Sequence, residues 1–158
     1  MKRLLIAGAA LLAAMLLLAA CGDDGENETE RRSTPATTAA PTGPATVKTA
    51  QTSIGTVLVD ADGKTLYLFA NDQGDTSAVP ANVLAAWPPL TVTGEPVAGE
   101  GIDEAKLGTA QQPDGQTWVS YNGHLLYRFT GDASAGQTTG HKIGNVWFAL
   151  TPAGDQAP

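Results

Sequence analysis

One stretch of this chain occurs twice, and this repetition constrains the fold more than any other feature. The segment Gly63–Asp72, with the sequence GKTLYLFAND, returns 60 residues later as Gly123–Asp132, with the sequence GHLLYRFTGD. Similarity at a fixed spacing predicts two structurally equivalent units in one fold. We therefore expect a first repeat at about residues 52–92 and a second repeat at about residues 109–152.

Each repeat is predicted to form a β-hairpin closed by a two-residue turn. Asp62-Gly63 lies between two β-rich runs of the first repeat, and Asn122-Gly123 has the same place in the second. Such dipeptides favour a type I′ turn, in which both central residues adopt positive φ. Because a turn of fixed length sets the register of its strands, the sequence also predicts cross-strand neighbours. The expected facing pairs are Leu58 with Tyr67 and Trp118 with Tyr127.

The rest of the globular part adds further short strands and few helical signals. A short helix is expected to start near Pro80, and one helical turn is expected between Ile102 and Leu107. A further hairpin is expected around Pro113-Asp114-Gly115. Closely spaced strands with Gly-rich turns predict an all-β domain. We expect a compact duplicated antiparallel hairpin or meander unit over residues 48–153, with one or two short helical turns, and a tail at 154–158.

The N-terminus has the pattern of a bacterial lipoprotein signal. Two basic residues precede an apolar run from Leu4 to Ala20, which ends in LAACG. Its length of about 17 residues is at the lower limit for a membrane-spanning helix. Small residues before a cysteine suit signal-peptide cleavage and lipid transfer to the thiol. Residues 1–20 are therefore predicted to be a signal peptide and Cys21 the lipidated first residue; an ordinary signal peptide or anchor is the alternative.

Composition indicates a tether between the lipid and the domain. Residues 21–47 are first acidic and then rich in Ser, Thr, Pro and Ala, so they cannot bury a core and are expected to be disordered. Without the two basic residues of the signal, the chain has 7 basic and 16 acidic residues. This balance argues against nucleic acid as a partner, since nucleic-acid binding requires a basic surface. The single cysteine, Cys21, excludes an internal disulfide.

Two copies of a Tyr-x-Phe-x-x-Asp motif resemble a family of bacterial lipoproteins built from a secreted repeat of unknown function. The segments WPPL at 87–90, LGT at 107–109 and YNG at 121–123 are also similar to that family. The resemblance covers nearly all of residues 52–152 and implies no established activity. The family pattern commonly has two cysteines before Trp-Pro-Pro, where this chain has Val79 and Val83. Cysteine-based redox chemistry or metal binding is therefore not expected in this member.

The motif residues admit two interpretations. In the structural one, the aromatic rings fill a core and each Asp accepts backbone N–H groups where the strand turns. In the functional one, Tyr and Asp from the two repeats line a shared groove at the duplication axis. The residues concerned are Tyr67, Phe69, Asp72 and Trp87 in the first repeat, and Tyr127, Phe129, Asp132 and Trp147 in the second.

Other chemistry-bearing residues form no complete motif. Carboxylates at Asp60, Asp62, Asp72 and Asp75 could supply oxygen ligands to calcium, but no EF-hand loop is completed, and turn roles are preferred. His124 and His141 are weak metal or haem candidates, because two imidazoles make an incomplete coordination shell. No nucleophile or phosphate-loop motif occurs. The sequence therefore predicts no catalytic residues, no metal site and no cofactor.

These observations lead to a functional hypothesis with two alternatives. We expect a non-enzymatic lipoprotein, anchored through Cys21 to the extracytoplasmic face of the bacterial cell membrane, that binds an envelope protein or glycan. The first alternative is an accessory protein for metal, haem or electron transfer. The second is a carbohydrate-binding module in which Trp87, Trp118 and Trp147 stack on sugars.

Overall fold

The computed structural model describes residues 44–158, which form an all-β domain, as the sequence predicts. The predicted signal peptide, Cys21 and most of the predicted tether lie outside the described residues. No helix in the part that the structure describes has the length and apolar character needed to cross a membrane. The elements are β1 (Thr46–Thr52), β2 (Gly55–Asp60), β3 (Tyr67–Phe69), β4 (Val97–Ala98), the 3-10 turn η1 (Glu104–Lys106), β5 (Leu107–Gln111), β6 (Thr117–Tyr121), β7 (His124–Leu125), the 3-10 turn η2 (Ile143–Asn145) and β8 (Trp147–Ala149).

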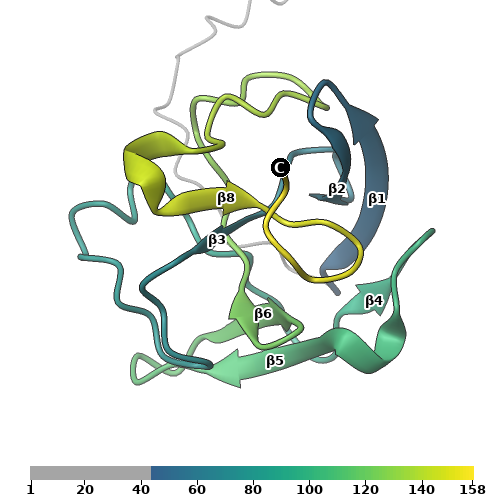
Figure 1. Ribbon diagram of the computed structural model, residues 1–158. Coiled ribbons are helices and arrows are strands. Elements are labelled where there is room, and N and C mark those ends of the chain that lie inside the picture. The colour runs from purple at the N-terminus through teal and green to yellow at the C-terminus, as the bar shows by residue number, and fades with distance from the viewer. Residues whose placement is uncertain (1–43) are drawn as a thin grey trace, which may run out of the picture. The chain divides into compact units, whose positions relative to one another are not determined.

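The strands form three small sheets. Strand β1 lies between β2, to which it is antiparallel, and β4, to which it is parallel. Strand β6 lies between β5 and β7, and both pairings are antiparallel. Strands β3 and β8 form the third sheet and lie side by side near the middle of the domain (Figure 1). The hairpin predicted around Pro113-Asp114-Gly115 is thus the β5–β6 pair.

Two of the expected boundaries and one expected helix are wrong. The ordered domain starts earlier than predicted: β1 begins at Thr46, inside the expected tether, and Val47 is fully buried. The expected tail is packed, since the Ala157 N–H donates to the Ala149 carbonyl oxygen at 2.8 Å. The helix expected near Pro80 is instead a series of turns, although the Leu84 N–H still donates to the Pro80 carbonyl oxygen at 3.3 Å.

The two repeats are interlocked, because the last segment of each completes the hairpin of the other. In the β3–β8 sheet, Tyr67 of the first repeat lies opposite Ala149 of the second. The reciprocal bridge joins Pro89 of the first repeat to Tyr127 of the second. At the centre, Tyr67 and Tyr127 exchange backbone hydrogen bonds of 2.8 and 2.9 Å. The duplication axis therefore passes between these two tyrosines.

The two hairpins close with different turns. Asn122 and Gly123 have φ of 50° and 78°, as the predicted type I′ turn requires, and Tyr121 lies opposite His124. The same prediction for Asp62-Gly63 is wrong. Only Gly63 has positive φ, at 80°, and the Gly63 N–H donates to the Asp60 carbonyl oxygen at 3.0 Å. This is the three-residue loop in which a type I turn is followed by a left-handed glycine.

The side chain of Asp60 stabilises the longer loop. Its Oδ1 accepts the backbone N–H groups of Asp62 and Lys64, each at 2.9 Å, which stabilises the wider turn. The second repeat has Ser120 at the aligned position, and there the structure forms no equivalent pair of bonds to the loop. The three-residue loop of the first repeat therefore has side-chain hydrogen bonds that the two-residue turn of the second repeat lacks.

Relative to the second repeat, the longer loop shifts the pairing of β2 with the strand that follows it by one residue. The side chains of β2 therefore point to the opposite faces from the aligned side chains of β6. In the second repeat, Trp118 packs at 5.9 Å from Tyr127 between ring centroids, which agrees with the predicted facing pair. In the first repeat the prediction is wrong, since the Leu66 N–H donates to the Leu58 carbonyl oxygen and Leu58 faces Leu66 rather than Tyr67.

The buried side chains form two clusters on opposite faces of the strands. The aromatic cluster contains both motif tyrosines and all three tryptophans, and the leucine cluster contains most of the buried leucines. The aromatic cluster consists of Val57, Val59, Tyr67, Val79, Trp87, Ala110, Trp118, Leu125, Tyr127, Trp147, Ala149 and Ala157. The leucine cluster consists of Ala45, Val47, Leu58, Leu66, Leu68, Leu90, Val92, Val119, Tyr121, Leu126 and Leu150.

Candidate functional site

The motif tyrosines and aspartates pair between repeats rather than within them. Tyr67 of the first repeat donates its hydroxyl to Asp132 Oδ2 of the second at 2.6 Å. Tyr127 of the second repeat donates to Asp72 Oδ2 of the first at 2.7 Å. The two bonds are related by the duplication axis. All four residues were predicted from the sequence as motif residues, but the sequence gave no indication that each tyrosine pairs with the aspartate of the other repeat.

Each aspartate also organises the backbone that follows its strand. Asp72 Oδ1 accepts the Ala78 N–H at 2.7 Å. Asp132 Oδ1 accepts both the N–H and the hydroxyl of Thr139, at 2.9 and 2.5 Å. Asp132 is only 4% exposed, whereas Asp72 is partly buried. The turn role expected for these residues is therefore present, and Tyr and Asp of the two repeats do meet, but in buried pairs.

Burial controls the ionisation of these groups. It raises the pKa of Tyr67 far above the ordinary tyrosine value, and the hydrogen bond to Asp132 and the charge of Asp132 act in the same direction. Burial likewise raises the pKa of Tyr127, against an opposing hydrogen bond to Ser77. Burial also raises the pKa of Asp72, opposed by its bonds from Tyr127 and Ala78. The tyrosines are thus neutral donors at physiological pH and are poorly suited to act as nucleophiles or bases.

Four aromatic rings stack across the duplication axis. Trp87 and Trp147 lie face to face, with 3.9 Å between ring centroids and 2° between planes. Phe129 stacks on the outer side of Trp87 at 4.3 Å, and Phe69 packs on Trp147 at 4.6 Å. Gly140 lies against this stack, since a Cβ there would be 2.7 Å from Trp87. The motif aromatics and the tryptophans therefore form one continuous core that ties the repeats together.

This stack contradicts the proposed use of the tryptophans as a sugar platform. Trp87 and Trp147 are each 4% exposed and Trp118 is 5% exposed, so their ring faces are covered by protein. Sugar stacking requires an accessible aromatic face. Core packing, the competing interpretation, describes all three residues.

The two histidines are engaged in separate places. His141 Nδ1 accepts the Ala149 N–H at 3.2 Å, and its Nε2 lies 3.1 Å from Pro158 O. His124 lies in β7 opposite Tyr121, and its charge acts to lower the pKa of Asp72. Within residues 44–158, no group of three or more His, Cys, Asp or Glu side chains is arranged to hold a metal ion.

The acidic residues considered for calcium are likewise not gathered into one site. Asp60 binds its own loop and the Nε of Arg128, and Asp72 binds Tyr127 and Ala78. At Val79 and Val83, where the family pattern commonly has cysteines, one side chain is buried in the aromatic cluster and the other packs against it. These positions contribute to the core.

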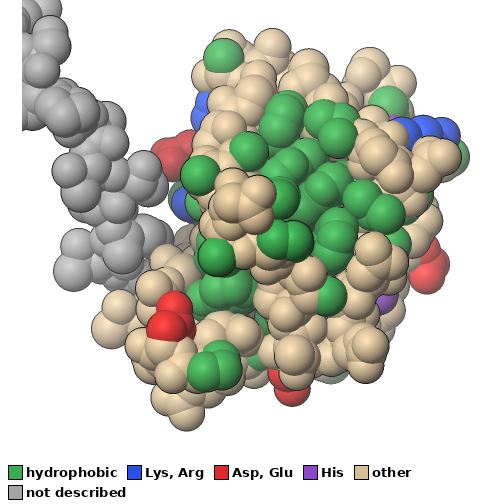
Figure 2. Space-filling view, turned by 90° about the vertical axis from the view of Figure 1, so that its left-hand side faces the viewer, with side chains coloured by type: hydrophobic (Ala, Val, Ile, Leu, Met, Phe, Trp, Pro, Cys, Tyr) green, Lys and Arg blue, Asp and Glu red, His purple; other side chains and the backbone are tan. Residues whose placement is uncertain are grey.

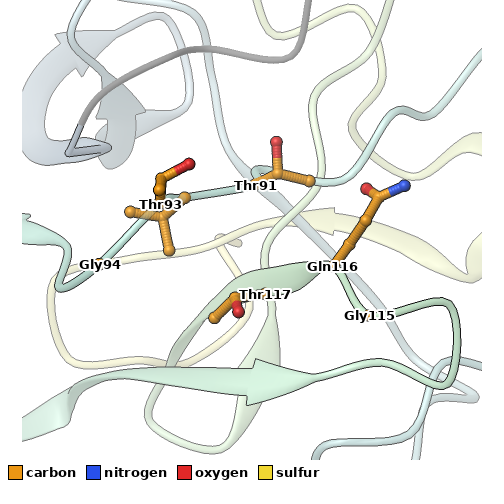
Figure 3. Close-up of a pocket in the computed structure, with 7 residues that line it drawn as sticks. Thr91, Thr93, Gly94, Gly115, Gln116 and Thr117 are labelled. Carbon is orange, nitrogen blue, oxygen red and sulfur yellow. The ribbon is translucent and has the colours of Figure 1, made fainter.

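Among the surface hollows of the described domain are two that the sequence did not predict. One has a volume of about 290 Å³ and lies between the segment Thr91–Gly94 and the turn before β6 (Figure 3). Its lining contains threonine, glutamine, glycine and valine and no charged side chain. Figure 3 shows the side chains of Thr91 and Gln116 pointing to the same side.

The second hollow has a volume of about 350 Å³ and includes charged groups. Lys64 and Arg128 line it together with Pro88 and Phe129. Its counterpart in the sequence is Arg128, which stands where the first repeat has Leu68. We name it the Arg128 hollow.

Fold and motifs together define a duplicated all-β domain whose two copies exchange their closing strands. The description "secreted repeat of unknown function" matches this chain twice, at residues 48–91 and 108–151. The chain belongs to this family, as the sequence motifs indicated, and its domain is extracytoplasmic. Both Tyr-x-Phe-x-x-Asp motifs lie within the matched residues, which also include most of β1 and β5. No curated protein and no solved structure matches the chain.

Proposed function

We propose that this protein is a lipid-anchored, extracytoplasmic binding module without enzymatic activity, and that it binds another component of the cell envelope. The family supports an extracytoplasmic location. The N-terminal pattern supports attachment through lipid at Cys21. The buried Tyr–Asp pairs support a structural role for the family motif, because their polar groups are consumed inside the fold. A binding site would then be formed by other residues, on the surface of the domain.

The observation that carries the binding role is an apolar face. Figure 2, which views the domain from the left of Figure 1, shows hydrophobic side chains gathered over the middle of that side. The partly exposed apolar residues that pack on the aromatic cluster include Phe69, Val83, Leu84, Phe129 and Val146. Contiguous apolar patches on a soluble domain mark interaction sites. An acidic, soluble domain that retains such a face is suited to docking a protein partner.

Lipid attachment is tested by metabolic labelling with a fatty-acid probe. Wild-type protein is expected to carry the label and to sediment with membranes. The Cys21→Ser variant is expected to lose the label and the membrane association. A Cys21→Ser protein that remains anchored would contradict the lipoprotein assignment.

Partner binding is tested by cross-linking in intact envelopes, followed by affinity capture. Leu84→Gln replaces a partly exposed apolar side chain that packs on the aromatic cluster and is expected to reduce the captured partner. Val97→Gln is the matched control, since Val97 is 44% exposed on β4 and lies outside both clusters. Equal capture by both variants, or no specific partner in wild type, would count against the proposal.

The metal, haem or electron-transfer alternative has no specific support in the geometry, because both ring nitrogens of His141 are occupied by backbone groups. A visible spectrum and metal analysis of protein isolated from its own envelope without chelator test it. A stoichiometric metal or a Soret band would revive that alternative.

A further inference from the structure

The domain has two structural halves, each a hairpin of one repeat completed by the last segment of the other, and the Arg128 hollow lies in only one of them. In the other half, Leu68 on β3 lies opposite Phe148 on β8, and Leu68 is only 2% exposed. The residues aligned with this pair are Arg128 and Pro88, and the Arg128 N–H donates to the Pro88 carbonyl oxygen at 2.9 Å. The backbone pairing is thus conserved between halves. A large apolar pair has been replaced by a small ring and a cation, which leaves an open hollow of about 350 Å³.

Two cations face this hollow. The Lys64 ammonium donates to the carbonyl oxygens of Asp132 and Ala133, at 2.8 and 2.5 Å. Arg128 uses its Nε to bind Asp60 Oδ2, and its side chain is 28% exposed. That bond is the one ion pair within residues 44–158, so no carboxylate of the described domain neutralises Lys64. The other N–H groups of the guanidinium make no hydrogen bond to residues 44–158 and can bind a ligand.

The carboxylate of Asp132 also borders the hollow but is already committed. Its Oδ2 accepts Tyr67, its Oδ1 accepts Thr139, and the residue is 4% exposed. The polar groups that remain for a ligand are therefore donors. Beside them, Phe129 and Pro88 provide apolar contact. A mostly apolar hollow with a few convergent polar groups is the usual form of a small-ligand site.

We propose that the Arg128 hollow binds a single carboxylate group carried on a small apolar or ring-shaped body. The planar guanidinium matches the two oxygens of a carboxylate. Asp60 pairs with Arg128, so Lys64 is the one lining cation without an ion-pair partner among residues 44–158, which suits a group with a single negative charge rather than a dianion such as phosphate. The body of the ligand lies against Phe129 and Pro88. This inference rests on the proposed binding function and specifies the chemistry of one ligand group.

The test is a titration of the isotope-labelled full chain in detergent, followed by nuclear magnetic resonance. N-acetylphenylalanine represents a peptide carboxylate and glucuronic acid an acidic sugar, while N-acetylphenylalaninamide and glucose are the matched neutral controls. Saturable shifts of the Arg128 Nε–H and Phe129 signals with either acid, and none with its neutral control, support the proposal. The acid that binds more tightly indicates the source of the carboxylate. Inorganic phosphate is expected to bind more weakly than both.

Two variants test whether the ligand binds in the Arg128 hollow. Pro88→Phe restores the aligned residue Phe148, is expected to fill the space, and should weaken binding at least about tenfold. Arg128→Lys keeps the charge and loses the planar fork, with an expected loss of similar size. Near-ultraviolet circular dichroism checks that each variant is folded. Equal binding of acid and amide, unchanged affinity in folded Pro88→Phe, or no binding of either acid at about 10 mM would overturn the proposal.

The failure of this inference is distinguishable from the failure of the proposed function. The envelope capture depends on Leu84 and the apolar face, whereas the titration depends on Arg128 and Pro88. If the partner is still captured but no carboxylate binds, the inference about the Arg128 hollow is overturned and the proposed binding function is not.

Discussion

The two halves of the domain have the same backbone pairing and differ in the side chains at the place where the last segment of one repeat meets the hairpin of the other. Around Leu68 and Phe148 the space is filled by apolar side chains, whereas around Arg128 and Pro88 it is an open, charged hollow. The Tyr–Asp pairs and the stacked tryptophans are the same in both halves. Because the motif tyrosines and the tryptophans are buried in both halves whereas Arg128 is partly exposed, we infer that the shared residues stabilise the fold and that the half with Arg128 is the one suited to binding.

The largest expected effect follows from separating the two repeats. Fragments 44–100 and 101–158 each lack the strand that completes their hairpin, so each alone is expected to lose tertiary structure. Mixed in equal amounts, they are expected to reassemble and recover near-ultraviolet circular dichroism. Size-exclusion chromatography checks the state of each species. A fragment that is folded and monomeric by itself would show that the repeats are independent units.

Alkaline pH is expected to destabilise the domain through both halves at once. The folded-state pKa values of Tyr67 and Tyr127 lie above the ordinary value of 10.0. Above pH 10 the unfolded chain therefore releases protons that the native state retains. Stability is complete below pH 10 and falls as pH rises, by up to about 1.4 kcal/mol per pH unit for each tyrosine. Urea unfolding at pH 9, 10 and 11 measures this slope, and a Tyr67→Phe/Tyr127→Phe variant should reduce it.

Removing one hydroxyl at a time compares the two Tyr–Asp pairs. Tyr67→Phe leaves the buried Asp132 without its partner and is expected to cost about 1.5–3 kcal/mol. Tyr127→Phe is expected to cost less, about 1 kcal/mol, because Asp72 is only partly buried and water can replace the lost bond. Chemical denaturation at pH 7 ranks the two. The reverse order would show that burial does not set the strength of these pairs.

The smallest expected effect is a difference in stability loss between substitutions in the two turns. Asn122 has φ of 50°, which alanine adopts poorly, so Asn122→Ala is expected to cost about 1 kcal/mol. Asp62 does not have positive φ, and Asp62→Ala is expected to lie within about 0.5 kcal/mol of wild type. Thermal unfolding of both variants measures the difference. Equal losses would mean that the two hairpins close with the same turn.

The sequence predicted the features that depend on local chemistry. The duplication, the all-β class and the Asn122-Gly123 turn could be predicted because a repeated pattern and a turn dipeptide each have a direct structural meaning. The family resemblance was confirmed by the two matched segments. The early start of β1 was missed because Thr46 and Val47 follow a Thr- and Pro-rich stretch whose composition masks a strand.

The exchanged partners could not be predicted from the sequence. Because the repeats are alike, Tyr67 finds the same residue type whether it binds Asp72 or Asp132. The one-residue shift in the first hairpin was hidden for a related reason. The gapless alignment suggested identical turns, whereas in the structure the hydrogen bonds of Asp60 to its own loop stabilise the longer one.

The most direct test of the interlocked duplication is a pair of double-mutant cycles measured by chemical denaturation. The first cycle combines Tyr67→Phe with Asp132→Asn, which are partners in different repeats. The second combines Tyr67→Phe with Asp72→Asn in the same repeat. A coupling energy above about 1 kcal/mol in the first cycle and one within about 0.5 kcal/mol of zero in the second are predicted. Strong coupling within the repeat and none between repeats would contradict the account.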